Sequence, residues 1–218
     1  MKKLIFLFTL CLLLAGCTRK NEPVTLPAPE PATRPIVQTN WIQPLPSAID
    51  LENLGDCTLS VSLQEGDIYT DDTGVTQMKL TVYDYDRYGA ADVAALRVGD
   101  TITIDGENVV VKELNVDAYG AVAINGGLDG DGYSLVTYED TTYHRLLEND
   151  SKDYHEVGNI TVPVDESFIY NDLSAEKPAV YTVSDLLSGK AEYSFYPQNT
   201  TVRLEKGQAV EMTRIFVP

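Results

Sequence analysis

The sequence predicts a mainly β protein, an antiparallel barrel or sandwich with a few short helices, built as one domain or as two small β lobes. Two observations carry this prediction. Several short segments alternate apolar and polar residues, and turn residues such as Asp-Gly separate them at close spacing. In addition, the helical patterns are too short to be stable without packing on a sheet.

The first expected strands are residues 58–63 and residues 77–85 (QMKLTVYDY), in which β-branched and aromatic residues alternate with polar ones. Because residues two apart in a strand point to the same face, Tyr83 and Tyr85 should lie on one side of the sheet. All thirteen tyrosines fall between Tyr69 and Tyr196. Such rings can bind sugars or form a protein interface, or they can simply cover a small core.

Three hairpins follow along the chain. The clearest is GDTITIDGENVVVKEL, with its turn at residues 105–108; the others join GAVAINGG to YSLVTY and cross Lys206-Gly207 near the C-terminus. Short helices are expected at 90–96, 143–148 and 183–189. Residues 84–104 and 192–212 align without gaps, which raises the hypothesis of an internal repeat.

The N-terminus carries export features. Lys2 and Lys3 precede an apolar stretch that is too short to span a bilayer, which is typical of a signal peptide. The end of this stretch, Leu-Ala-Gly-Cys at residues 14–17, resembles the lipobox of bacterial lipoprotein precursors. This resemblance implies a signal peptide at 1–16, a lipidated Cys17 and an extracytoplasmic location on a bacterial cell membrane. The alternative is an ordinary secretory signal that is cleaved elsewhere.

Residues 17–46 form the expected tether, because seven of the eleven prolines lie between residues 21 and 46. Trp41, at its end, is expected to pack on the domain. Residues 47–218 form the expected β-rich domain, with sub-lobes at 54–140 and 157–218 if it divides.

The cysteines predict no disulfide framework. Cys11 would leave with the signal peptide and Cys17 would carry lipid, so the mature chain would keep only Cys57 as a free thiol. Cys57 lies in an expected strand and is interpreted as a buried structural residue. The alternative is a nucleophile, which needs a histidine partner and an electropositive setting.

The charge argues against nucleic-acid binding. The formal net charge is −17, and loss of Lys2 and Lys3 would make it −19, so the chain repels phosphate backbones. Two acidic clusters are candidate calcium sites. In the first, Asp84, Asp86, Gly89 and Asp92 match positions 1, 3, 6 and 9 of an EF-hand loop, but Tyr88 at position 5 and Ala95 at position 12 do not.

The second acidic cluster is Asp129 and Asp131, in a glycine-rich loop that fits either a calcium site or an ordinary turn. His144 and His155 are interpreted as surface residues.

No catalytic motif is apparent, which favours a binding protein over an enzyme. The leading hypothesis is a membrane-anchored extracytoplasmic binding domain, whose partner beyond the membrane is a glycan or another envelope protein. The alternatives are a cell-wall or glycan hydrolase that uses a carboxylate pair, and a calcium-organised binding module.

Overall fold

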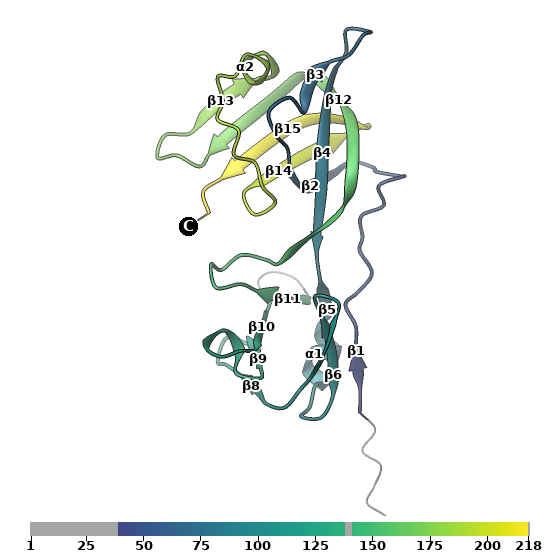
Figure 1. The fold of residues 1–218 in the computed structure, drawn as a ribbon, viewed down its shortest axis with the longest axis vertical. Helices are drawn as coiled ribbons and strands as arrows, with labels where there is room; N and C mark the ends of the chain where they lie inside the picture. The colour runs from purple at the N-terminus through teal and green to yellow at the C-terminus, as the bar shows by residue number, and fades with distance from the viewer. Residues whose placement is uncertain (1–38, 138–140, 218) are drawn as a thin grey trace, which may run out of the picture. The chain divides into compact units, whose positions relative to one another are not determined.

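The computed structural model describes residues 39–137 and 141–217, and it confirms a mainly β chain with few short helices. Figure 1 shows the course of the chain. Its buried apolar residues form two separate clusters, so we describe two lobes. The expected signal peptide, the lipobox with Cys17 and most of the proline-rich tether lie outside the described residues.

The barrel lobe consists of β2 (Cys57–Ser62), β3 (Ile68–Thr70), β4 (Thr76–Tyr85), β12 (Tyr154–Leu173), β13 (Ala179–Thr182), α2 (Val183–Leu187), β14 (Thr200–Glu205) and β15 (Gln208–Ile215). The first half of β12 pairs antiparallel with β4, and its second half pairs parallel with β15. Since β15, β14, β2 and β4 are joined in turn by antiparallel pairs, five strands close into a ring.

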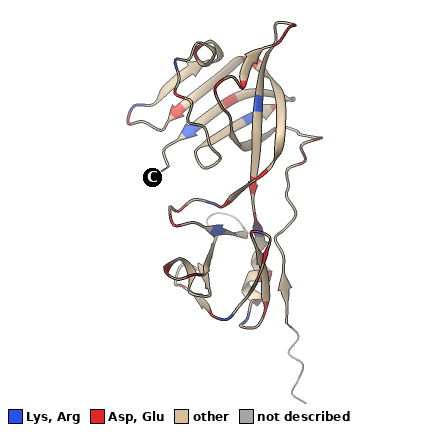
Figure 2. Ribbon diagram, viewed as in Figure 1, with Lys and Arg blue, Asp and Glu red and all other residues tan. Residues whose placement is uncertain are grey.

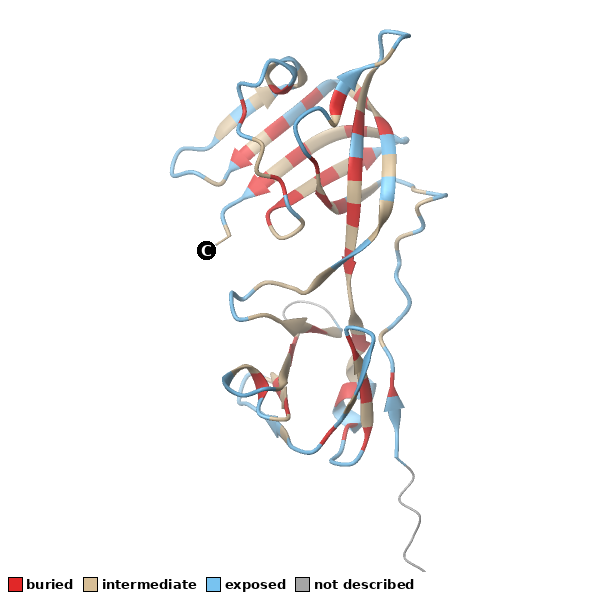
Figure 3. Cartoon of the chain, in the orientation of Figure 1, coloured by how far each residue is buried: buried red, intermediate tan, exposed pale blue. Residues whose placement is uncertain are grey.

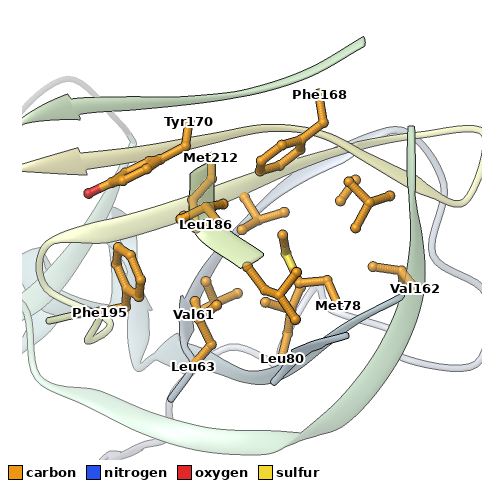
Figure 4. Packing of buried hydrophobic residues seen from close by; sticks show 14 of the residues in the cluster. Val61, Leu63, Met78, Leu80, Val162, Phe168, Tyr170, Leu186, Phe195 and Met212 are labelled. Atoms are coloured by element: carbon orange, nitrogen blue, oxygen red, sulfur yellow. The ribbon is translucent and has the colours of Figure 1, made fainter. Parts of the chain in front are cut away.

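Every second side chain along these strands points into the ring and fills its interior. Val61, Met78, Leu80, Tyr170 and Met212 are fully buried, and the residues between them point outward. Figure 4 shows these side chains meeting inside the barrel lobe. The helix α2 adds Leu186 to the same core, and its first turn is closed by a capping box.

The small lobe consists of β1 (Trp41–Ile42), β5 (Arg87–Gly89), α1 (Ala90–Ala95), β6 (Thr101–Ile104), β7 (Glu107–Val110), β8 (Leu114–Val116), β9 (Val122–Ile124), the 3-10 turn η1 (Gly127–Asp129), β10 (Tyr133–Val136) and β11 (Thr142–Leu146). The sheets β1-β6-β7 and β5-β11-β10-β9-β8 share a core that includes Ile42, Tyr88, Ile102 and Ile124.

The three expected hairpins are confirmed as β6–β7, β9–β10 and β14–β15. Two of them turn through residue pairs with positive φ, Asp105-Gly106 at 52° and 73° and Lys206-Gly207 at 52° and 78°. Two consecutive left-handed residues give the turn that matches the twist of a hairpin, and Gly adopts this conformation without strain.

Several sequence-based expectations differ from the structure. Residues 143–148 are not a helix, because β11 pairs with both β10 and β5. Residues 57–85 share a core with residues 154–215, so the two cores divide the chain differently from the ranges 54–140 and 157–218. The aligned segments 84–104 and 192–212 also differ, since α1 in the first aligns with strand residues in the second.

The end of the expected tether is part of the small lobe. Trp41 and Ile42 form the strand β1, which pairs parallel with β6, and Ile42 is buried. Trp41 contacts this sheet as expected, through a hydrogen bond from its Nε1 to Thr103 Oγ1 (3.0 Å), although the indole stays largely exposed.

Candidate functional site: a tyrosine-lined pocket

The outer face of the barrel lobe carries a row of tyrosines. In β4, Met78, Leu80 and Val82 point into the core, so Tyr83 and Tyr85 point outward on one face, as the sequence predicts. Cross-strand pairing sets Tyr154 of β12 opposite Tyr85. Three rings from two neighbouring strands therefore gather on one surface.

These rings line a cavity of about 430 Å³. One wall is the segment from Ala48 to Gly55, and the floor includes the outward residues Thr58 and Ser60 of β2. Ser60 Oγ donates to Tyr154 Oη (3.4 Å). The volume lies within the range of small-molecule sites, and the lining mixes aromatic faces with hydroxyl and carboxylate groups.

The Tyr85 ring is held from several sides. It makes edge contacts with His144 (5.6 Å between ring centroids) and with Tyr154 (5.7 Å). The Lys152 Nζ lies 4.0 Å from the ring centroid and donates to Tyr85 Oη (2.9 Å), and the Arg87 guanidinium lies 5.0 Å from the centroid. A ring fixed in this way loses little freedom when a ligand binds beside it.

Asp84 fixes the rim of the pocket. Its buried carboxylate accepts hydrogen bonds from Ser47 Oγ (2.5 Å), from the Tyr85 backbone N–H (2.9 Å) and from Arg87 Nη2 (2.9 Å). The Arg87 carbonyl in turn accepts from the Leu45 N–H (2.7 Å). Asp84 thus joins β4, the start of β5 and the segment that covers the pocket.

Two further titratable groups of the pocket, Asp50 and Cys57, have shifted pKa values. Hydrogen bonds from the Asn53 side chain and the Glu52 backbone N–H lower the pKa of Asp50, so it stays ionised at neutral pH. Burial and the neighbouring Asp56 raise the pKa of the Cys57 thiol, which keeps it protonated and unsuited to act as a nucleophile.

The expected calcium ligands lie in the β9–β10 loop, at the end of β4 and in α1. Asp129 and Asp131 are exposed around η1, in the loop of the β9–β10 hairpin. Asp84 is committed to Ser47 and Arg87 at the end of β4, while Asp92 is exposed in the first turn of α1. Among residues 39–137 and 141–217, no group of three or more His, Cys, Asp or Glu side chains could hold a metal ion.

A second, acidic cavity was not foreseen from the sequence. It has about 430 Å³ and is lined by Asp86, Asp105, Asp153 and His155. Arg145 pairs with Asp105 and with Asp153 (2.6 Å), which neutralises part of this charge. Elsewhere the Asp and Glu residues are spread over the loops and strands of both lobes (Figure 2).

The two histidines differ in their surroundings. His155 is exposed, as expected, whereas His144 is buried in β11 behind Tyr85, so its interpretation as a surface residue is wrong. The error follows from the missed strand, because alternation along β11 turns His144 inward.

Comparison with known proteins gives no relative: no family model, no curated protein and no solved structure matches this chain. Within the described part of the chain, no helix has the length and apolar character needed to cross a membrane.

Proposed function

We propose that this protein is a membrane-anchored extracytoplasmic lipoprotein that binds a saccharide in the tyrosine-lined pocket without transforming it. The anchor is inferred from the lipobox at Cys17. The pocket supports the binding role, and the observation that carries it is the fixed Tyr85 ring beside Tyr154 on the pocket surface.

A saccharide suits this lining for chemical reasons. One face of a pyranose ring presents C–H groups that stack on aromatic rings, while its hydroxyls need hydrogen-bond partners at the edge. The pocket offers both, because Asp50, Asn53 and Thr58 lie on the same cavity wall and floor as the tyrosines. A cavity of about 430 Å³ accommodates a short oligosaccharide segment rather than a large macromolecule.

The lining also supports binding without turnover. Glycoside hydrolysis needs one protonated and one ionised carboxyl group facing the same bond. The Asp84 carboxylate accepts hydrogen bonds from Ser47 and Arg87, and the hydrogen bonds that Asp50 accepts lower its pKa. No carboxyl group on the pocket wall is therefore arranged as a general acid.

Calorimetric titration tests the proposal, with oligomers of N-acetylglucosamine and of glucose as probes. Replacing the ring in Tyr85→Leu should weaken binding about tenfold, which corresponds to about 1.4 kcal/mol. Tyr119→Leu is the control, because Tyr119 is 94% exposed on the turn between β8 and β9 and should bind like the parent. Release of shorter sugars during the titration would replace the binding role with that of a hydrolase.

A further inference from the structure

Exposed apolar side chains gather on the small lobe at residues that do not line the tyrosine-lined pocket. Trp41, Thr101 and Val110 are cross-strand neighbours on β1, β6 and β7, and they point away from the core that holds Ile42 and Ile102. The side chains of Trp41 and Val110 are 60% and 50% exposed. Large apolar side chains grouped on an exposed sheet face are typical of interaction surfaces.

Val98 extends this surface. It is 63% exposed in the loop before β6, and the N–H of the next residue, Gly99, donates to the Val111 carbonyl (2.8 Å). That bond joins the loop to the end of β7, beside Val110. We call Trp41, Val98 and Val110 the tryptophan patch.

The indole lies along the sheet. Trp41 pairs with Thr101, but its Nε1 donates to Oγ1 of Thr103, two residues further along β6 (3.0 Å). The protein thus satisfies the only polar group of the indole. What remains exposed is an apolar ring face, which is suited to the boundary between lipid headgroups and acyl chains.

The chain reaches the small lobe at this patch. The Asn40 N–H donates to Asp100 Oδ1 (2.8 Å), and the Asn40 carbonyl accepts from the Thr101 N–H (2.9 Å). Cys17, the expected lipidation site, lies about 20 residues before this point. An anchor at Cys17 is therefore joined to the small lobe through the strand that carries Trp41.

The charges around the patch favour a lipid surface, although the chain as a whole is acidic. Arg97 and Lys112 are exposed beside Val98 and Val110. The Asp100 carboxylate is withdrawn from the surface, because it is 4% exposed and accepts the backbone N–H groups of Asn40 and Arg97. Glu113 is the exposed acidic neighbour of Lys112.

We propose that the tryptophan patch docks on the headgroup region of the membrane that carries the anchor; this inference rests on the anchor part of the proposed function. Three side chains bind a membrane weakly on their own. Tethering makes the docking step intramolecular, at an effective concentration that weak contacts can use. Docking orients the small lobe toward the membrane.

The test uses the full lipidated chain in phosphatidylcholine vesicles that contain phosphatidylglycerol. Trp41 is the only tryptophan, so its fluorescence reports on the patch alone. Phospholipid brominated near the headgroup should quench the emission at least twofold, and acrylamide in the water should quench it less than in the same protein in detergent. Val98→Asp should abolish the lipid quenching. Val180→Asp should not, because Val180 is equally exposed on β13 of the barrel lobe.

Three outcomes would overturn the inference, and they separate it from the proposed function. Protein that floats with the vesicles but shows no lipid quenching keeps its anchor and has no docking patch. Protein that does not float refutes the anchor and the docking together. A change of Trp41 emission on adding oligosaccharide without vesicles would assign the patch to sugar binding instead.

Discussion

Replacing Asp84 with Asn should loosen the rim of the tyrosine-lined pocket and destabilise the fold. The substitution keeps the shape of the side chain but removes the charge that Arg87 pairs with and presents an NH2 group to donors such as Ser47 Oγ. Hydrogen bonds to a charged group contribute about 1.5–3 kcal/mol each. Because the Arg87 side chain is 24% exposed, solvent screens its ion pair with Asp84. We therefore expect a total loss of about 2–3 kcal/mol.

Thermal unfolding followed by circular dichroism measures this loss. For a domain of this size, 1 kcal/mol corresponds to about 2–4 °C, so the Asp84→Asn melting temperature should fall by about 5–10 °C. The matched control is Asp131→Asn, which changes an exposed carboxylate in the same way and should stay within about 0.5 kcal/mol of the parent. An Asp84→Asn protein that melts within 1 °C of its control would show that this carboxylate does not hold the rim.

Three further predictions concern single groups. Burial alone would raise the pKa of Asp172, but hydrogen bonds, led by the one from Arg214, outweigh burial and lower this pKa. The ionised Asp172 carboxylate therefore stabilises the fold above about pH 4, and this stabilisation is lost as the pH falls through the lowered pKa. Asp172→Asn should destabilise the protein at pH 7 by about 3 kcal/mol and flatten the acid limb of its stability curve, whereas an unchanged acid limb would refute this role. Iodoacetamide should modify Cys57 slowly at pH 7 in the folded mature chain and quickly after unfolding, because burial and Asp56 raise the pKa of the thiol; equal rates would refute this. Millimolar calcium should raise the melting temperature of the metal-stripped chain no more than magnesium does, since Asp129 and Asp131 are exposed and no cluster of metal ligands is present among the described residues; a calcium-selective rise that Asp129→Asn removes would restore the calcium site.

Local patterns predicted the strands and hairpins well. In β4 and β14–β15, alternation and turn chemistry agree with the burial of the same residues in the fold. β11 was missed because its five residues are bounded by an apolar Leu-Leu pair that also fits a short helix. Only the pairing of β11 with β5 and β10 decides between the two, and that pairing is a long-range contact.

The candidate site could be predicted only in part. The alternation of β4 places Tyr83 and Tyr85 on one face, and this follows from the sequence. That Tyr154 lies opposite Tyr85 depends on the register between β12 and β4, strands that are separated in the sequence by all the elements from β5 to β11. The role of Asp84 was missed for the same reason, because its partner Ser47 lies in a segment with no strand or helix pattern.

Saccharide titration of the parent and of Tyr85→Leu tests the central claim most directly, because it asks whether the pocket binds and whether the fixed ring matters. The account predicts saturable binding of at least one probe oligosaccharide to the parent, about tenfold weaker binding to Tyr85→Leu, and unchanged binding to Tyr119→Leu. No binding to the parent, or equal affinity in a folded Tyr85→Leu protein, would contradict it.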